Sequence, residues 1–122
     1  MRFTRDQITA NTVRRVERGS IVIGDRTYTG SIGLLAETVL EAWPDRPFDE
    51  LDEASLRPML AEEPEMLIVG CGWGPVLPPR RLVFAMARAG IGVEVMDTPA
   101  ACRTFNILIS EDRRPGAILY ID

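Results

Sequence analysis

The sequence predicts an α/β fold with a parallel strand–helix–strand unit at its centre. An apolar run from Met66 to Val69 ends in the glycine-rich turn 70–74. A helical stretch from Arg80 to Ala89 follows, and a second apolar run, Ile91–Met96, comes directly after Gly90. Apolar strands that alternate with helices are typical of parallel sheets. Because the crossover between such strands is right-handed, both strands end at one edge of the sheet, where ligands of open α/β sheets usually bind.

The N-terminal part predicts a small antiparallel β element. Three short strand-like runs, Thr12–Glu17, Ser20–Ile23 and Arg26–Tyr28, are separated by turns that each contain a glycine. A further strand is expected over Ile32–Leu35. The stretch Thr38–Trp43 fits either another strand or a single helical turn.

The start of the next helix depends on Pro58, which follows the proline-containing loop Trp43–Phe48. If Asp52 capped this helix, Pro58 would lie past the first turn and would remove a needed N–H group. If Ser55 is the cap, Pro58 lies in the first turn, where the N–H groups are free anyway. We therefore expect a short helix from about Leu56.

The C-terminal part predicts one more helix and one more strand. Thr98 is the expected N-cap of the helix and Pro99 its first residue, while Asp97 adds a favourable charge near the positive end of the helix dipole. Loss of such a cap costs about 1 kcal/mol. After the turn 113–116, the near-continuous apolar run Ala117–Ile121 is the expected last strand.

Length and composition indicate one domain, residues 1–122, with 46% hydrophobic and 26% charged residues. No apolar stretch approaches the roughly 18 residues of a membrane span, so we expect the chain not to be transmembrane. The N-terminus lacks the apolar core of a secretory signal, which makes a cytoplasmic location the default expectation. Two cysteines are too few for a disulfide scaffold.

The sequence contains neither histidine nor lysine, and all 14 basic residues are arginine. This excludes histidine bases, Ser–His and Cys–His pairs, histidine metal sites, Schiff-base lysines and the Walker lysine. We therefore expect no catalytic residues, no cofactor and no metal. The net charge is −4, and residues 37–65 alone carry ten acids against two arginines, or −8. An acidic chain without a concentrated basic face is not expected to bind nucleic acid.

A crevice is expected where the loops after the parallel strands meet. The glycine turn does not match the dinucleotide fingerprint, since Pro75 stands where that pattern needs glycine. Cys71 and Cys102 lie on converging segments, and Cys102 is near a helix N-terminus, where a thiol pKa tends to fall. The alternative for both is a buried cysteine that packs as a small hydrophobe. Gly72 is expected to be structural, because a bulky residue there would harm folding if its φ is positive.

Asn106 adds a polar group to the same helix. Arg103 and Asn106 share a helix face and could hold an anion, although an Asn106 that bonds to neighbouring loop backbone is the preferred interpretation. The complete expected crevice consists of Gly70, Cys71, Gly72, Trp73, Asp97, Thr98, Cys102 and Asn106.

The segment Met96–Leu108, with its Met-Asp-Thr, Ala-Cys and Asn-Ile-Leu groups, resembles a known family. This is the family of small α/β domains that includes the mitochondrial complex I assembly factor 3 and many bacterial proteins. Gly70-Cys71-Gly72 stands where the family has Gly-Thr-Gly, and 28–31 and Trp43 fit its earlier half. The resemblance implies a three-layer α/β domain with a mixed central sheet and an extra antiparallel β element. It implies no catalytic residues, and it implies an accessory role in respiratory complex assembly.

Two functions of different classes follow. The first is a non-enzymatic protein-interaction or assembly-factor domain, whose partner is another protein or a second copy of the chain. Because aromatic residues are common interface anchors, we expect contact at Trp73 or at the Trp43–Phe48 loop, unless both tryptophans belong to the core. The alternative is a small-molecule, anion or thiol-redox site formed by Cys71, Asp97 and Cys102.

Overall fold

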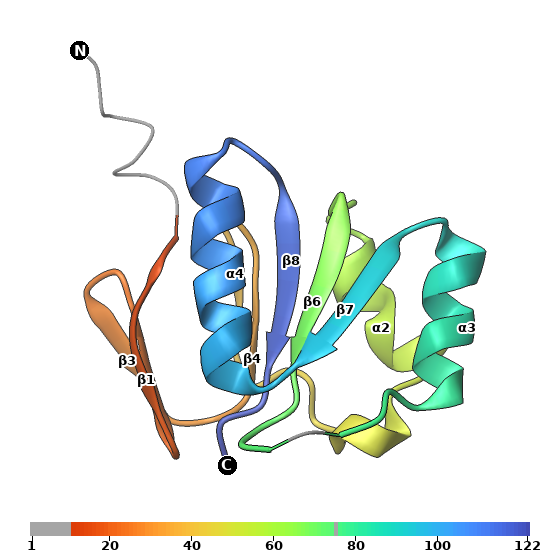
Figure 1. Cartoon of the computed structure of the whole chain (residues 1–122), viewed down its shortest axis with the longest axis horizontal. Helices are drawn as coiled ribbons and strands as arrows, with labels where there is room; N and C mark the ends of the chain where they lie inside the picture. Colours follow the sequence, from red (N-terminus) through yellow and green to blue (C-terminus); the bar gives the residue numbers. More distant parts are fainter. Residues whose placement is uncertain (1–10, 75) are drawn as a thin grey trace.

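A computed structural model describes residues 11–74 and 76–122, and its centre is a five-stranded mixed sheet (Figure 1). The strands lie in the order β5-β4-β8-β6-β7, of which β8, β6 and β7 are parallel and β4 is antiparallel to both neighbours. Their bounds are β4 (Ile32–Leu34), β5 (Val39–Leu40), β6 (Met66–Gly70), β7 (Gly92–Met96) and β8 (Pro115–Leu119). The predicted α/β class and the parallel pairing of β6 with β7 are confirmed.

Helices cover both faces of this sheet and give the three layers that the resemblance implied. The helices are the 3₁₀ turn η1 (Phe48–Glu50), α2 (Glu53–Leu60), α3 (Arg80–Ala89) and α4 (Thr98–Ser110). Side chains of β6 alternate between two hydrophobic cores, because successive strand residues point to opposite faces. Ile68 packs in the core that contains the buried residues of α4, whereas Leu67 and Val69 pack with the buried residues of α2 and α3.

The predicted antiparallel meander is present as a separate sheet, and it packs against α4. Its strands are β1 (Val13–Glu17), β2 (Ser20–Ile23) and β3 (Arg26–Tyr28). The side chain of Asn106 links α4 to this meander: Oδ1 accepts from the Val13 N–H, and Nδ2 donates to the Val13 carbonyl, both at 2.8 Å. Asn106 therefore bonds to backbone, as preferred above, although its partner is a strand and not a loop.

Helix α2 begins earlier than expected. Asp52 is its N-cap, and a start at Leu56 with Ser55 as the cap was wrong. The reason is a reciprocal capping box, in which the Ser55 N–H donates to Asp52 Oδ1 and the Asp52 N–H donates to Ser55 Oγ, each at 2.9 Å. These two bonds offset the single N–H group that Pro58 removes from the helix. The undecided stretch before it contains the short strand β5.

The last strand also begins earlier, at Pro115, and ends at Leu119. Proline is tolerated at the first residue of a strand, where its missing N–H group breaks no internal ladder bond. The expected range Ala117–Ile121 was therefore displaced by two residues. As a consequence, Tyr120 lies beyond the end of β8, at the same edge as the loops that follow β6 and β7 (Figure 1).

Candidate functional site

Thr98 joins the segments that follow the three parallel strands. Its Oγ1 accepts from the Gly72 N–H at 2.8 Å and donates to the Tyr120 carbonyl at 2.6 Å. Its own N–H donates to the Gly72 carbonyl at 2.8 Å. The Thr98 side chain is fully buried, so these bonds are shielded from water. The Thr98 hydroxyl thus holds the segments that follow β6 and β8 against the start of α4.

The cap of α4 is Asp97, and the prediction that Thr98 is the N-cap was wrong. Asp97 Oδ1 accepts from the Ala100 N–H at 2.8 Å, while Thr98 is already the first helical residue. The Thr98 hydroxyl instead bonds to the Gly72 N–H and to the Tyr120 carbonyl. The residue before it, Asp97, therefore caps the helix. The φ angle of Gly72 is 109°, which is the condition under which a bulky residue at this position is expected to harm folding.

A pocket of about 330 Å³ lies at the end of β6 and β7. It brings together Cys71 and Asp97 of the expected crevice, and the Cys71 Sγ lies 3.7 Å from the Gly74 carbonyl oxygen. The pocket is lined by Cys71, Gly74, Val76, Val95, Met96 and Asp97. The described residues, 11–74 and 76–122, contain no cluster of three or more carboxylate, thiol or imidazole groups that could hold a metal ion.

The structure does not bring Cys102 to this pocket. Cys102 is buried in the core with Phe105 and Ala101, and burial raises the pKa of its thiol to about 12. The structure therefore agrees with the alternative given above, a buried cysteine that packs as a small hydrophobe, and desolvation outweighs the lowering effect of the Arg103 charge on the thiol pKa. Burial also raises the pKa of the half-buried Cys71 thiol, and the charge of Asp97 adds to this effect.

Both cysteines should consequently react slowly with a charged alkylating reagent such as iodoacetate at neutral pH, because the thiolate is the reactive form. We expect Cys71 to be labelled more slowly than a free thiol, and faster as the pH rises. Cys102 should resist labelling until the protein unfolds. Mass spectrometry of timed samples measures both rates, with urea-unfolded protein as the control. Rapid labelling of Cys102 in the folded protein would contradict its placement in the core.

The two tryptophans are partly buried and pack against the hydrophobic cores. Trp43 Nε1 donates to the Ser55 carbonyl at 3.1 Å, and its ring covers Gly33 so closely that a Cβ there would lie 2.7 Å from ring carbons. Trp43 is thus partly buried and packs against the core that contains the buried residues of α2 and α3, which favours the core interpretation of this residue. Trp73 packs partly against the core below α4, and the Arg18 guanidinium lies 5.2 Å from its ring centroid.

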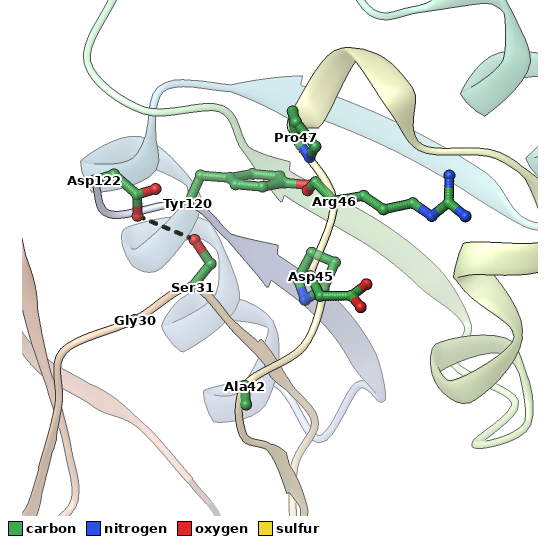
Figure 2. Close-up of a pocket in the computed structure, with 9 residues that line it drawn as sticks. Gly30, Ser31, Ala42, Asp45, Arg46, Pro47, Tyr120 and Asp122 are labelled. Carbon is green, nitrogen blue, oxygen red and sulfur yellow. Dashed lines mark hydrogen bonds between the residues drawn. The ribbon is translucent and has the colours of Figure 1, made fainter.

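A larger pocket, of about 450 Å³, lies beside Tyr120 (Figure 2). It was not predicted, since Tyr120 was placed inside the last strand. The Tyr120 hydroxyl donates to the Arg46 carbonyl at 2.8 Å, and Ser31 Oγ donates to Asp122 Oδ1 at 3.3 Å. The lining residues are Gly30, Ser31, Ala42, Pro44, Asp45, Arg46, Pro47, Tyr120 and Asp122.

Four large apolar residues in the loop after β6 and in α3 are exposed. Leu77 is 87% exposed and Phe84 is 65% exposed, and Val76 and Val83 are also exposed. We call these four residues the 76–84 surface. Phe84 follows the buried Leu82 by two positions, which turns it about 200° around the helix. That spacing, present in the sequence, is the signal that could have identified Phe84 as a surface residue.

The fold and the site define a small three-layer α/β domain whose candidate binding features lie after the carboxyl ends of its parallel strands. Residues 13–120 match the family model described as "Protein of unknown function (DUF498/DUF598)". The chain belongs to this family.

Relatives and solved structures agree with this assignment. The chain is 31% identical over 84% of both chains to the "13 kDa major membrane protein" of Francisella tularensis. It is 38% identical, over 84% of its own length, to the bovine "NADH dehydrogenase [ubiquinone] 1 alpha subcomplex assembly factor 3", of which it covers 55%. A crystal structure from Bordetella parapertussis matches with a TM-score of 0.83 and 32% identity, over 93% of this chain and 98% of the other. None of the helices among the described residues is long and apolar enough to cross a membrane.

Proposed function

We propose that this chain is a non-enzymatic interaction domain that assists the assembly of a respiratory complex by binding a partner protein. The observation that carries the proposal is the 38% identity to the bovine assembly factor over 84% of this chain. The chain spans about half of that protein, so any role of the remaining half lies outside the proposal.

The 76–84 surface supports this function, and we propose it as the partner-binding surface in place of the tryptophans. Large apolar side chains that remain in water, as Leu77 and Phe84 do, commonly mark protein interaction sites. Burying such a side chain in an interface is favourable by about 1.5–3 kcal/mol relative to leaving it exposed. The raised thiol pKa of Cys71 is poorly suited to nucleophilic chemistry near neutral pH.

Deletion of the gene in a native host that has a respiratory NADH dehydrogenase tests the function. We expect the fully assembled enzyme to decrease on native gels, its subunits to accumulate in smaller complexes, and the wild-type chain to restore assembly. An unchanged amount of assembled enzyme in the deletion strain would contradict the proposal.

Serine substitutions at Leu77 and Phe84 test the proposed surface. Both side chains are exposed, so the double variant should fold with an unchanged melting temperature. It should nevertheless fail to restore assembly in the deletion strain, because the apolar anchors are lost. The control is Ile107→Ser, which removes an exposed apolar residue from α4, on the other side of the sheet. Full restoration by the double variant would place the partner elsewhere.

A small-molecule site is the second candidate function, and the 330 Å³ pocket that contains Cys71 and Asp97 favours it. A thiol pair with Cys102 does not form part of this candidate, since that residue is in the core. Screening of small polar ligands by thermal shift tests the candidate. A ligand that stabilises the wild-type protein but not Asp97→Asn would support it, and a screen without such a ligand would count against it.

A further inference from the structure

The ring of Tyr120 forms a fixed wall of the larger pocket. The Tyr120 N–H donates to the Gly70 carbonyl at 3.0 Å, and the Tyr120 carbonyl accepts from Thr98. The hydroxyl is bonded to the Arg46 carbonyl, and Phe48 packs edge-on against the ring at a centroid distance of 6.1 Å. The ring is thus held at both ends, so its orientation does not need to be organised when a ligand enters.

The pocket lies between two segments that differ in character. Figure 2 shows Ser31 and Asp122 close together on one side of the pocket and the loop that carries Ala42 and Pro47 on the other, with the Tyr120 ring extending between them. The ring and the loop prolines offer apolar surface, whereas Asp122 and Ser31 offer polar oxygens. A ligand that fits has both a flat or apolar part and a hydrogen-bond donor.

Asp45 and Asp122, the two carboxylates that line the pocket, form no ion pair with an arginine among the described residues, although Arg46 is also part of the lining. Among the described residues, the two ion pairs are Arg88–Glu53 and Arg113–Glu65, and neither includes a carboxylate of this pocket. Figure 2 shows the Arg46 side chain extending away from Asp122 and Ser31. Burial raises the pKa of the Tyr120 hydroxyl, and the nearby charges of Asp122 and Asp49 raise it further. The loop wall also belongs to the segment 37–65, whose net charge is −8.

We propose that this pocket receives an arginine side chain of the partner protein. The inference rests on the proposed function and names one chemical group by which the partner is recognised. A guanidinium is planar, so it stacks on the Tyr120 ring while its N–H groups donate to the Asp122 carboxylate. Its apolar stem packs against the prolines of the loop wall, Pro44 and Pro47. The volume of about 450 Å³ accommodates such a side chain.

The test uses the tripeptide acetyl-Gly-Arg-Gly-amide as the probe and ¹⁵N–¹H NMR spectra of the whole chain as the readout. We expect saturable shifts of the backbone amides of Ser31, Tyr120 and Asp122, with millimolar affinity. The matched probe contains citrulline, which has nearly the same shape as arginine without its charge, and should cause much smaller shifts. Asp122→Asn should weaken binding of the arginine probe about five-fold, whereas Asp25→Asn, in the distant β2–β3 turn, should not change it.

Three results would overturn the inference: absence of shifts at these amides, equal binding of the citrulline probe, or full affinity in Asp122→Asn. The spectra themselves report whether each variant is folded. If the arginine probe does not bind but the chain still restores assembly in the deletion strain, only this pocket's role is wrong. If the probe binds and the deletion has no effect on assembly, the pocket binds arginine and the proposed function is wrong.

Discussion

Replacement of Thr98 by valine should lower the free energy of unfolding by about 2–4 kcal/mol. Valine has nearly the shape of threonine, but it removes the hydroxyl that accepts from the Gly72 N–H and donates to the Tyr120 carbonyl. Both backbone groups would then lie in a buried region without this partner, and a buried unsatisfied polar group costs about 1–3 kcal/mol. The loss should exceed that of an N-cap, which is about 1 kcal/mol.

Urea denaturation of three variants separates these roles. Thr98→Ser keeps the hydroxyl and should retain most of the stability, with a loss of about 1 kcal/mol from the missing methyl group. Asp97→Ala removes the observed cap and should cost about 1 kcal/mol. If Thr98→Val is no less stable than Asp97→Ala, the hydroxyl does not join the strand exits as described.

Alanine at Gly70 is expected to destabilise the protein by about 1–3 kcal/mol, the usual cost of overpacking. The last residue of β6 lies directly against the first turn of α4. A Cβ on Gly70 would be 2.9 Å from both Cα and Oγ1 of Thr98, and 3.1 Å from the Ala101 Cβ. A backbone atom cannot move aside as the end of a flexible side chain can, so β6 and α4 would have to separate.

Gly92→Ala is the matched control, because Gly92 lies in the neighbouring strand β7 and a Cβ there would meet no atom within 4 Å. We expect its melting temperature to equal or slightly exceed that of the wild type, since alanine loses less backbone entropy on folding than glycine. A Gly70→Ala variant as stable as Gly92→Ala would show that the close approach of β6 and α4 is absent in solution.

Most of the fold could be predicted from the sequence, because apolar runs and glycine turns mark the parallel strands directly. The predicted starts of two elements were wrong, and each of these elements contains a proline. Pro115 was interpreted as part of a turn, yet it is the first residue of β8. Pro58 was taken to forbid an early helix start, yet the bonds between Asp52 and Ser55 make that start favourable. In both cases the local conformational preference of proline was outweighed by contacts with other residues, which cannot be inferred from the position of the proline alone.

The site was less predictable, because its properties arise from contacts between distant segments. The edge where the loops meet was predicted from the crossover rule, and the pocket does join Cys71 and Asp97. The sequence could not show that Thr98 bonds to Gly72 and Tyr120, residues 26 and 22 positions away. Nor could it show how deeply Cys102 is buried, which determines its thiol pKa.

Photo-crosslinking in the native host tests the central claim most directly. A photoreactive phenylalanine analogue replaces the exposed Leu77, and a control chain carries it at Asp25, which is exposed in the β2–β3 turn. We predict that irradiation joins the Leu77 position, and not the Asp25 position, to an identified subunit of the respiratory NADH dehydrogenase. Absence of any such subunit from the Leu77 crosslinks, or equal crosslinking from both positions, would contradict a partner-binding role for the 76–84 surface.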